Sequence, residues 1–217
     1  MAVTTHLWVL AVALGVTALI NWRSVARGDV IVERLTKPLV IVLLMGIAWS
    51  LEWEGAVAGA PELLPVLVAL TLSLVGDVAL LNPTAGRFLL GLGSFLLAQV
   101  AYIWAITGTA GAGGFPWWLL VAVPALLAVH ARVGRDIVRH AGKQRGAVLL
   151  YELGLFALVL AATWKGDPVV VLGSVLFLAS DTVLGHDRFV QARPWAPLTV
   201  IVTYHLAQTL IVVGLFR

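Results

Sequence analysis

Two aspartates lie inside stretches of the sequence that are otherwise apolar. Asp77 lies near the end of the apolar run 62–81, and Asp181 lies near the end of a second run, 168–185. An acidic side chain inside a membrane-spanning helix costs roughly 2.5–3.5 kcal/mol on insertion scales, so it is a candidate for function. A single such aspartate can also make a structural contact between helices or reach water at a helix end. Two aspartates at matched depth favour function.

Two carboxyl groups in a poorly solvated site can divide the work of acid–base catalysis. Burial disfavours the charged form of each group, and the charge of one disfavours ionisation of the other. One group can then stay protonated as an acid while the other is ionised as a base, as in the hydrolysis of acetal-like bonds. The pair by itself does not indicate which bond is cleaved.

Other chemistries fit the sequence less well. The chain has no cysteine, which excludes disulfides, thiolate metal sites and cysteine nucleophiles. An intramembrane aspartyl protease would carry Tyr-Asp and Gly-x-Gly-Asp motifs, whereas the two aspartates here follow Val75-Gly76 and Ser180. A zinc-dependent lipid amidase needs about three protein ligands, and of the histidines only His205 lies well inside an apolar run. We therefore expect no metal and no other cofactor.

The composition is that of a polytopic membrane protein. Of the 217 residues, 61% are hydrophobic and 12% are charged, whereas soluble domains are roughly 45–50% apolar and about 25% charged. No tail or charge-rich block is large enough for a separate soluble domain, so we expect a single all-α domain over residues 1–217. The basic residues lie in short loops, so the net charge of +3 requires no nucleic-acid partner.

Eight apolar windows predict eight transmembrane helices. A helix needs about 20 residues to cross the hydrocarbon core, and the first two windows are expected to extend into their flanks. The windows are residues 6–20, 38–51, 62–81, 88–107, 115–131, 146–164, 168–185 and 196–216. In this scheme Lys37 opens the second helix at the inner membrane surface.

Basic residues predict the orientation of these helices. No lysine or arginine precedes the first window, so we expect its amino terminus outside and no cleaved signal peptide. After eight spans both termini lie on the outer side, where Lys165 and Arg217 are the basic residues. Those of the inner side are Arg23, Arg27, Arg34, Lys37, Arg87, Arg132, Arg135, Arg139, Lys143, Arg145, Arg188 and Arg193. Tryptophans near the predicted interfaces, including Trp22, Trp164 and Trp195, are expected to be membrane anchors.

The polar residues of these helices converge in the inner half of the membrane. Both aspartates lie about 7 Å from the inner ends of their helices at 1.5 Å per residue. The other polar residues at similar or somewhat greater depth are Lys37, Gln99, Tyr151, Glu152, Tyr204, His205 and Gln208. Ser73 and Asp77 share one helix face, and Gly76 and Gly173 leave space for close helix approach. We expect a polar pocket with an apolar rim toward the cytoplasmic leaflet.

A weak internal repeat relates the two aspartate helices. The tetrapeptide DVAL at 77–80 resembles DTVL at 181–184, and one helix later LAQ at 97–99 matches LAQ at 206–208. The third and fourth predicted helices would then correspond to the seventh and eighth, which implies two parallel four-helix halves. Short matches in apolar sequence also arise by chance.

These motifs, taken in order, resemble those of a known family. The matching residues are Lys37-Pro38, the block 73–80, Gly91, Phe95, Tyr102, Tyr151, the block 177–184, Phe189 and the block 204–211. In them the chain resembles the YhhN-like, lysoplasmalogenase-like family of integral membrane proteins, over the second to eighth predicted helices. It departs at Gln99, where many members are expected to have histidine, and at His205, where tyrosine is common.

The resemblance implies an eight-helix enzyme that hydrolyses the vinyl ether bond of lysoplasmalogens to a fatty aldehyde and a glycerophospho-headgroup. Asp77 and Asp181 would then be the catalytic acid and base. The substrate would be a lysophospholipid of the surrounding membrane. The expected substrate-binding residues are Lys37, Ser73, Gln99, Tyr102, Tyr151, Ser180, Tyr204, His205 and Gln208. Lys37 is a candidate phosphate contact, and it could equally be a lysine that only sets topology.

A non-enzymatic alternative remains open at the level of sequence. In a proton-coupled transporter or lipid-binding membrane protein, the two aspartates would form a proton or cation site between parallel halves. Against this, the aspartates lie at one membrane level rather than along a path. Turnover distinguishes the alternatives, and the sequence predicts no oligomeric state.

Overall fold

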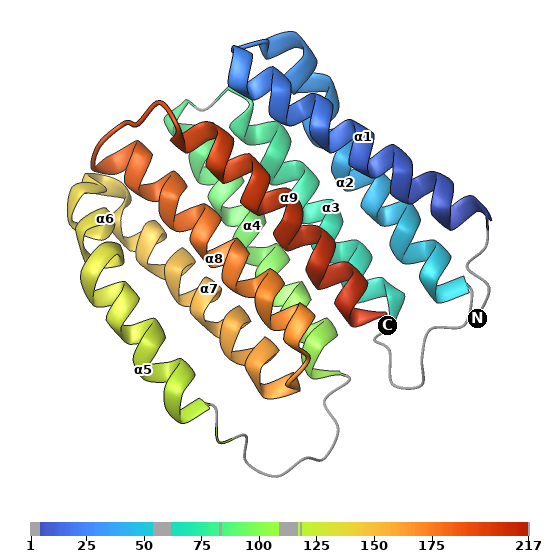
Figure 1. The fold of residues 1–217 in the computed structure, drawn as a ribbon. Coiled ribbons are helices and arrows are strands. Elements are labelled where there is room, and N and C mark those ends of the chain that lie inside the picture. Colours follow the sequence, from blue (N-terminus) through green and yellow to red (C-terminus); the bar gives the residue numbers. More distant parts are fainter. Residues whose placement is uncertain (1–4, 54–61, 83, 109–116, 118, 217) are drawn as a thin grey trace.

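The computed structural model describes residues 5–53, 62–82, 84–108, 117 and 119–216, and these ranges are helical with no strand among them (Figure 1). This confirms the all-α fold class. The helices are α1 (Thr5–Arg27), α2 (Val30–Trp53), α3 (Leu63–Leu80), α4 (Ala85–Thr107), α5 (Leu119–Val129), the π-helical turn η1 (His130–Gly134), α6 (Arg135–His140), the 3₁₀ turn η2 (Gly142–Gln144), α7 (Arg145–Lys165), α8 (Pro168–Phe189) and α9 (Ala196–Leu215).

Within the described ranges, six helices are long and apolar enough to cross a membrane: α1, α3, α4, α7 together with η2, α8 and α9. The expected count of eight is not confirmed by this criterion. The helix α2 is long, but its first half carries Glu33, Arg34 and Lys37. The helix α5 has only 11 residues before the wider π-helical turn begins at His130.

The second helix begins earlier than the sequence predicted. It starts at Val30, and the chain stays helical through Pro38, so Lys37 lies about two turns inside α2 and does not open it. The expectation that Lys37 begins the helix was therefore wrong. Proline removes one backbone hydrogen bond from a helix interior, and here the helix continues past it.

The best-packed neighbours are the antiparallel pairs α3–α4 and α8–α9, with α1–α2 next. Glycine permits the close approach in the first two pairs. A Cβ atom on Gly76 would lie 2.6 Å from the Phe95 ring of α4, and one on Gly173 would lie 2.9 Å from the Ile211 backbone nitrogen of α9. Both glycines therefore have the role in helix packing that the sequence suggested.

Sequence signals at residues 165–168 explain the turn between α7 and α8. Gly166 ends α7 in the left-handed region at φ 77°, which a residue without Cβ adopts at little cost. Asp167 then caps α8, because its Oδ1 accepts hydrogen bonds from the amides of Val169 and Val170 at 2.8 and 3.0 Å. Pro168 occupies the first helical turn, where its missing N–H is not needed.

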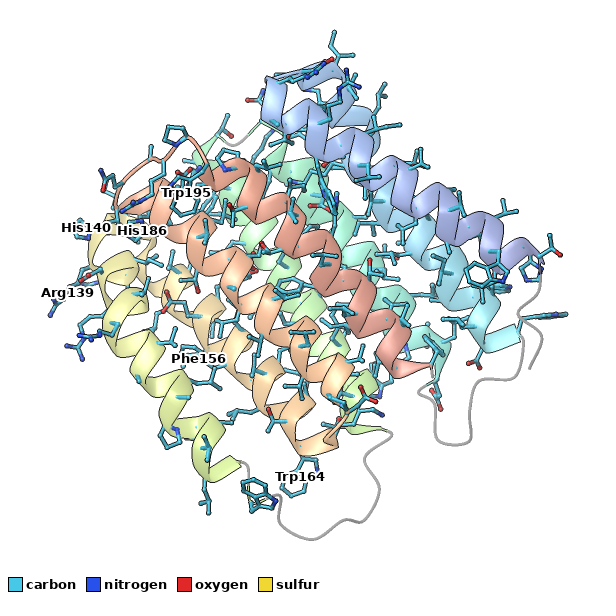
Figure 2. The ribbon with its side chains drawn as sticks, in the orientation of Figure 1. Arg139, His140, Phe156, Trp164, His186 and Trp195 are labelled. Atoms are coloured by element: carbon cyan, nitrogen blue, oxygen red, sulfur yellow. The ribbon has the colours of Figure 1, made fainter. Side chains whose placement is uncertain are left out.

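The connections between the helices lie at two opposite ends of the bundle. The α1–α2 turn, the α8–α9 connection and α6 lie at one end, while α1 begins, α9 ends and α7 turns into α8 at the other (Figure 1). The exposed indoles of Trp195 and Trp164 lie at these opposite ends (Figure 2). This spacing fits their expected position at the two membrane interfaces.

Candidate functional site

Asp77 is held by one cation and one hydroxyl group. It lies on α3 with only 1% of its side chain exposed, and its Oδ1 is 3.3 Å from the Lys37 Nζ of α2. Its Oδ2 accepts a hydrogen bond of 2.8 Å from the Tyr204 hydroxyl of α9. Both carboxylate oxygens therefore have a donor, which is the condition for keeping a charge in an apolar interior.

A hydrogen-bond network extends from Tyr204 across three helices. The Gln208 Nε2 donates to the Ser73 Oγ at 3.0 Å and to the Tyr204 hydroxyl at 3.3 Å. The Gln208 Oε1 accepts a hydrogen bond from the Tyr102 hydroxyl. Both the nitrogen and the oxygen of the Gln208 amide are thus hydrogen-bonded. The network fixes the position of Tyr204 and hence of Asp77.

Asp181 has a different environment. It lies on α8, and its Oδ2 accepts a hydrogen bond from the Tyr151 hydroxyl of α7. Among the described residues it has no ion-pair partner, so of the two aspartates only Asp77 is paired directly with a cation.

Three aromatic rings pack together where α4, α8 and α9 meet. Phe95 of α4, Phe177 of α8 and Tyr204 are in mutual edge contact, with centroids 5.7 to 6.3 Å apart. Phe177 is fully buried, and the Tyr204 ring of this cluster carries the hydroxyl group that binds Asp77. A buried aromatic cluster lowers the local polarity and so strengthens electrostatic interactions near it.

Asp181 reaches a small pocket, and Asp77 does not line it. This cavity, called the Asp181 pocket, has a volume of about 40 Å³. Its lining includes Phe88, Phe95, Tyr151, Glu152, Asp181 and Phe189. A cavity needs about 10–15 Å³ to hold one water molecule, so the pocket has the size for a few waters. Water next to a carboxyl group is what a hydrolytic reaction requires.

Three of the other predicted site residues have different contacts. Ser180 donates its hydroxyl to the Val200 carbonyl oxygen at 3.0 Å, a contact that joins α8 to α9. Gln99 is fully buried between α4 and α7, and neither atom of its amide has a hydrogen bond of good geometry. His205 accepts a hydrogen bond of 3.0 Å at Nδ1 from the Trp22 indole.

His205 also lines a second cavity, separate from the Asp181 pocket. This cavity, called the α1–α9 groove, is lined by side chains of α1, α2 and α9. They include Trp8, Gly15, Trp22, Ile47, His205 and Thr209. The network therefore unites Lys37, Ser73, Tyr102, Tyr204 and Gln208 around Asp77, leaves Tyr151 with Asp181, and places His205 elsewhere.

Two residues of interest were not among the predicted site residues. Glu152 lines the Asp181 pocket, and its depth beside Tyr151 was the only signal in the sequence. Trp22 was expected to be an interfacial anchor, and its bond to His205, 183 positions away, depends on helix packing that sequence alone does not give. The described residues contain no group of three or more histidine, aspartate and glutamate side chains arranged to hold a metal ion.

The fold defines a multi-pass, all-helical membrane protein with an aspartate on each of two helices, α3 and α8. The chain belongs to the YhhN family, whose sequence pattern matches residues 32–215. It is 32% identical to lysoplasmalogenase TMEM86B of Homo sapiens over 184 residues, which cover 84% of this chain and 75% of that protein.

Two further relatives carry the same activity in their names. The chain is 31% identical to the lysoplasmalogenase of Mycobacterium tuberculosis over 153 residues, covering 68% of this chain and 59% of that one. It is 33% identical to the TMEM86B of Sus scrofa over 147 residues, covering 66% of this chain and 59% of that protein. The match thus spans less than two thirds of these two relatives. No solved structure matches the chain.

Proposed function

We propose that this chain is a lysoplasmalogenase-like hydrolase, which cleaves the vinyl ether bond of a lysophospholipid within the membrane. The products are a fatty aldehyde and a glycerophospho-headgroup. The observation that carries the proposal is the pair of Asp77 and Asp181, one bound to Lys37 and the other beside a water-sized pocket. Relatives named lysoplasmalogenase that share about a third of their residues with the chain support the same reaction.

Asp181 is the proton donor in the mechanism that we propose. A vinyl ether is hydrolysed by protonation of the alkene carbon that is not bonded to oxygen, which leaves an oxocarbenium ion at the other alkene carbon. Asp181 gives this proton and becomes a carboxylate. Water adds to the cationic carbon and returns a proton to Asp181, giving a hemiacetal, which collapses to aldehyde and alcohol with a second proton relay through the same group. Tyr151 orients the carboxyl group through its hydrogen bond.

Asp77 is the fixed negative charge of the site. It is held by Lys37 and Tyr204, so it stays ionised and stabilises the oxocarbenium ion without moving. The aromatic cluster of Phe95, Phe177 and Tyr204 increases that stabilisation, because it lowers the polarity beside Asp77. In this mechanism Lys37 neutralises Asp77 in the resting enzyme and also lies near the phosphate of the bound lipid.

The membrane orientation that we propose places the site toward the cytoplasmic leaflet, with both termini outside. Basic residues at the end of the bundle that carries the α1–α2 turn, α6 and the α8–α9 connection support it. Asp77 and Asp181 lie within about two turns of that end of their helices. A lysophospholipid of the cytoplasmic leaflet would present its vinyl ether at this depth.

The decisive experiment is aldehyde release from a lysoplasmalogen by the detergent-purified protein. Asp77→Asn and Asp181→Asn should each abolish release, and Asp136→Asn, which changes an exposed carboxylate of α6, should not. Thermal unfolding and gel filtration check that each variant is folded. If the folded parent protein released no aldehyde, the proposal would be contradicted. Proton-coupled transport and lipid binding would then be the functions to test.

A further inference from the structure

Aromatic rings hold the Arg188 side chain at the end of α8. Its guanidinium carbon lies 3.8 Å from the centre of the Phe88 ring of α4 and 5.8 Å from that of the Phe189 ring. The two rings are in edge contact with each other, with centroids 5.6 Å apart. A guanidinium group is attracted to the electron-rich face of a ring and is more weakly hydrated than an ammonium group. Arg188 therefore has a defined position on the protein surface.

The donors of this guanidinium group are not used within the protein. Among the residues that the structure describes, the Arg188 side chain has no hydrogen-bond or ion-pair partner. The residue is exposed, so an anion can reach it. A guanidinium group carries five N–H donors in one plane, and pairs of them match two oxygens of a phosphate group. Arg188 is thus positioned to bind an anion from outside the protein.

The rings that hold Arg188 also line the Asp181 pocket. The lining residues of this pocket on α8 are Asp181, Thr182, Leu184, Gly185 and Phe189. The pocket therefore follows α8 from the aspartate to the last residue of the helix. Asp181 and Arg188 are seven residues apart, which places them on one side of α8 and about 10 Å apart along its axis.

We propose that Arg188 binds the phosphate group of the lysophospholipid while the vinyl ether lies at Asp181. This inference rests on the proposed function, since it assigns a part of that substrate. The glycerol of the substrate, with one hydrogen-bond length at each end, covers the distance between the two side chains. The helix α8 ends on the side of the bundle that carries α6 (Figure 1), which the proposed orientation places at the cytoplasmic headgroups. Lipid phosphates lie at this level, outside the hydrocarbon core.

Lys37 does not replace Arg188 in this role. In the proposed mechanism Lys37 is also near the phosphate, but its Nζ is 3.3 Å from the Asp77 Oδ1 and its charge is already paired. It lies about two turns inside α2, whereas Arg188 is the next-to-last residue of α8. Arg188 supplies the unpaired positive charge. An alkenylglycerol, which has no phosphate, should therefore be a poor substrate, and Arg188 determines this specificity.

Binding of lipids that are not cleaved tests the inference. Hexadecyl-glycerophosphoethanolamine, whose ether is saturated, is compared with hexadecylglycerol at equal mole fraction in detergent micelles. We expect the parent to bind the phospholipid about tenfold more tightly, and Arg188→Gln to bind the two lipids alike. Arg139→Gln is the matched control and should keep the preference. It removes the same charge from an exposed arginine on the outer side of α6, at the same end of the bundle (Figure 2).

Turnover of lysoplasmalogen gives a second readout. Arg188→Gln should raise KM about tenfold and leave kcat within about twofold of the parent, because both aspartates are unchanged. A loss of kcat with unchanged KM would overturn the inference. So would equal binding of the two lipids by the parent, an unchanged preference in folded Arg188→Gln, or the same loss of preference in Arg139→Gln.

Another variant covers the case in which Arg188→Gln does not fold. Phe88→Leu keeps the arginine and removes the ring that lies 3.8 Å from it, so the preference for the phospholipid should fall part of the way. An unchanged preference in this variant would contradict the role of the ring in positioning Arg188. Inorganic phosphate alone should bind much more weakly than the phospholipid, because it has no chain to bury. Equal binding would assign Arg188 to the free anion and overturn the inference.

The two assays separate this inference from the proposed function. The binding assay requires no hydrolysis, so it can be performed whether or not the parent is active. A parent that prefers the phospholipid but releases no aldehyde from lysoplasmalogen contradicts the proposed function alone. Normal aldehyde release with binding and KM that do not depend on Arg188 contradicts the phosphate site alone.

Discussion

Lys37 and Asp77 form an ion pair between α2 and α3, with Nζ 3.3 Å from Oδ1 and side-chain exposures of 13% and 1%. Asp181 receives its hydrogen bond from Tyr151, again from the preceding long helix, but from a neutral hydroxyl group. Each carboxyl group thus has a partner on the long helix that precedes its own, and the two partners differ in charge. This difference is why we propose a charged role for Asp77 and a proton-donating role for Asp181.

Removing the cation should destabilise the protein and abolish catalysis. Breaking a buried ion pair from one side costs about 3–5 kcal/mol, because the remaining charge is uncompensated. Lys37→Met should therefore lower the unfolding temperature clearly, as followed by thermal unfolding in detergent. Aldehyde release should fall by more than a hundredfold.

The double variant Lys37→Met/Asp77→Asn tests whether the ion pair is the cause. With both charges removed, stability should recover most of the loss while activity stays absent. If Lys37→Met were as stable and as active as the parent, the pair would have neither a structural nor a catalytic role.

Two tyrosines of one network should differ in their effect on turnover. Tyr204 donates to the Asp77 carboxylate, whereas Tyr102 donates to the neutral amide of Gln208. Hydrogen bonds to charged groups contribute about 1.5–3 kcal/mol, which corresponds to about 10- to 100-fold in rate. Tyr204→Phe should therefore reduce kcat by that factor, and Tyr102→Phe should reduce it much less.

Tyr204→Phe should also be the less stable variant, because it removes hydrogen bonds with both Asp77 and Gln208, whereas Tyr102→Phe removes only the one to Gln208. Steady-state kinetics of aldehyde release, with thermal unfolding of both proteins, provides the comparison. Equal losses of kcat would mean that Tyr204 acts only by holding the helices together.

The sequence predicts the elements of this site well because burial in a membrane leaves a strong pattern. Long apolar runs mark most of the helices, and ionisable residues inside them stand out as candidates for function. Lys37, Asp77 and Tyr204 were singled out in this way, and the structure brings them into contact. Depth along each helix predicted that they lie in the same half of the membrane, although Lys37 was expected at the start of its helix and lies about two turns inside it.

The pairing of side chains could not be predicted in the same way, because it depends on the rotation of each helix. Ser180 was expected in the site, and its hydroxyl is bonded to a backbone carbonyl of α9. His205 was expected near the aspartates and lines the α1–α9 groove with Trp22. The π-helical turn at 130–134 has no clear signal in the apolar pattern that precedes it.

A matched pair of glycine-to-alanine substitutions tests whether close helix packing requires glycine. A Cβ on Gly173 would lie 2.9 Å from the Ile211 backbone nitrogen and 3.0 Å from the Ala207 carbonyl oxygen, neither of which can move without moving α9. Gly173→Ala should therefore destabilise the protein by about 1–3 kcal/mol. Gly93 has open space around the same position, so Gly93→Ala should be neutral or stabilising by up to about 1 kcal/mol.

Thermal unfolding in one detergent measures both variants. Because α9 carries Tyr204 and Gln208, Gly173→Ala should also reduce aldehyde release, while Gly93→Ala should not. A Gly173→Ala protein of parental stability would mean that α8 and α9 are less closely packed than 2.9 Å implies.

The proposed orientation can be tested with single cysteines, since the chain has none of its own. Arg87 is exposed at the start of α4, and Glu52 is exposed near the end of α2. These residues lie at opposite ends of the bundle, as α2 and α4 begin at the same end. A membrane-impermeant maleimide applied to intact cells should label Glu52→Cys at once. It should label Arg87→Cys only after the membrane is permeabilised, because basic residues stay on the cytoplasmic side. The reverse labelling would place the Asp77 and Asp181 site in the outer leaflet and change the pool of lipid available to it.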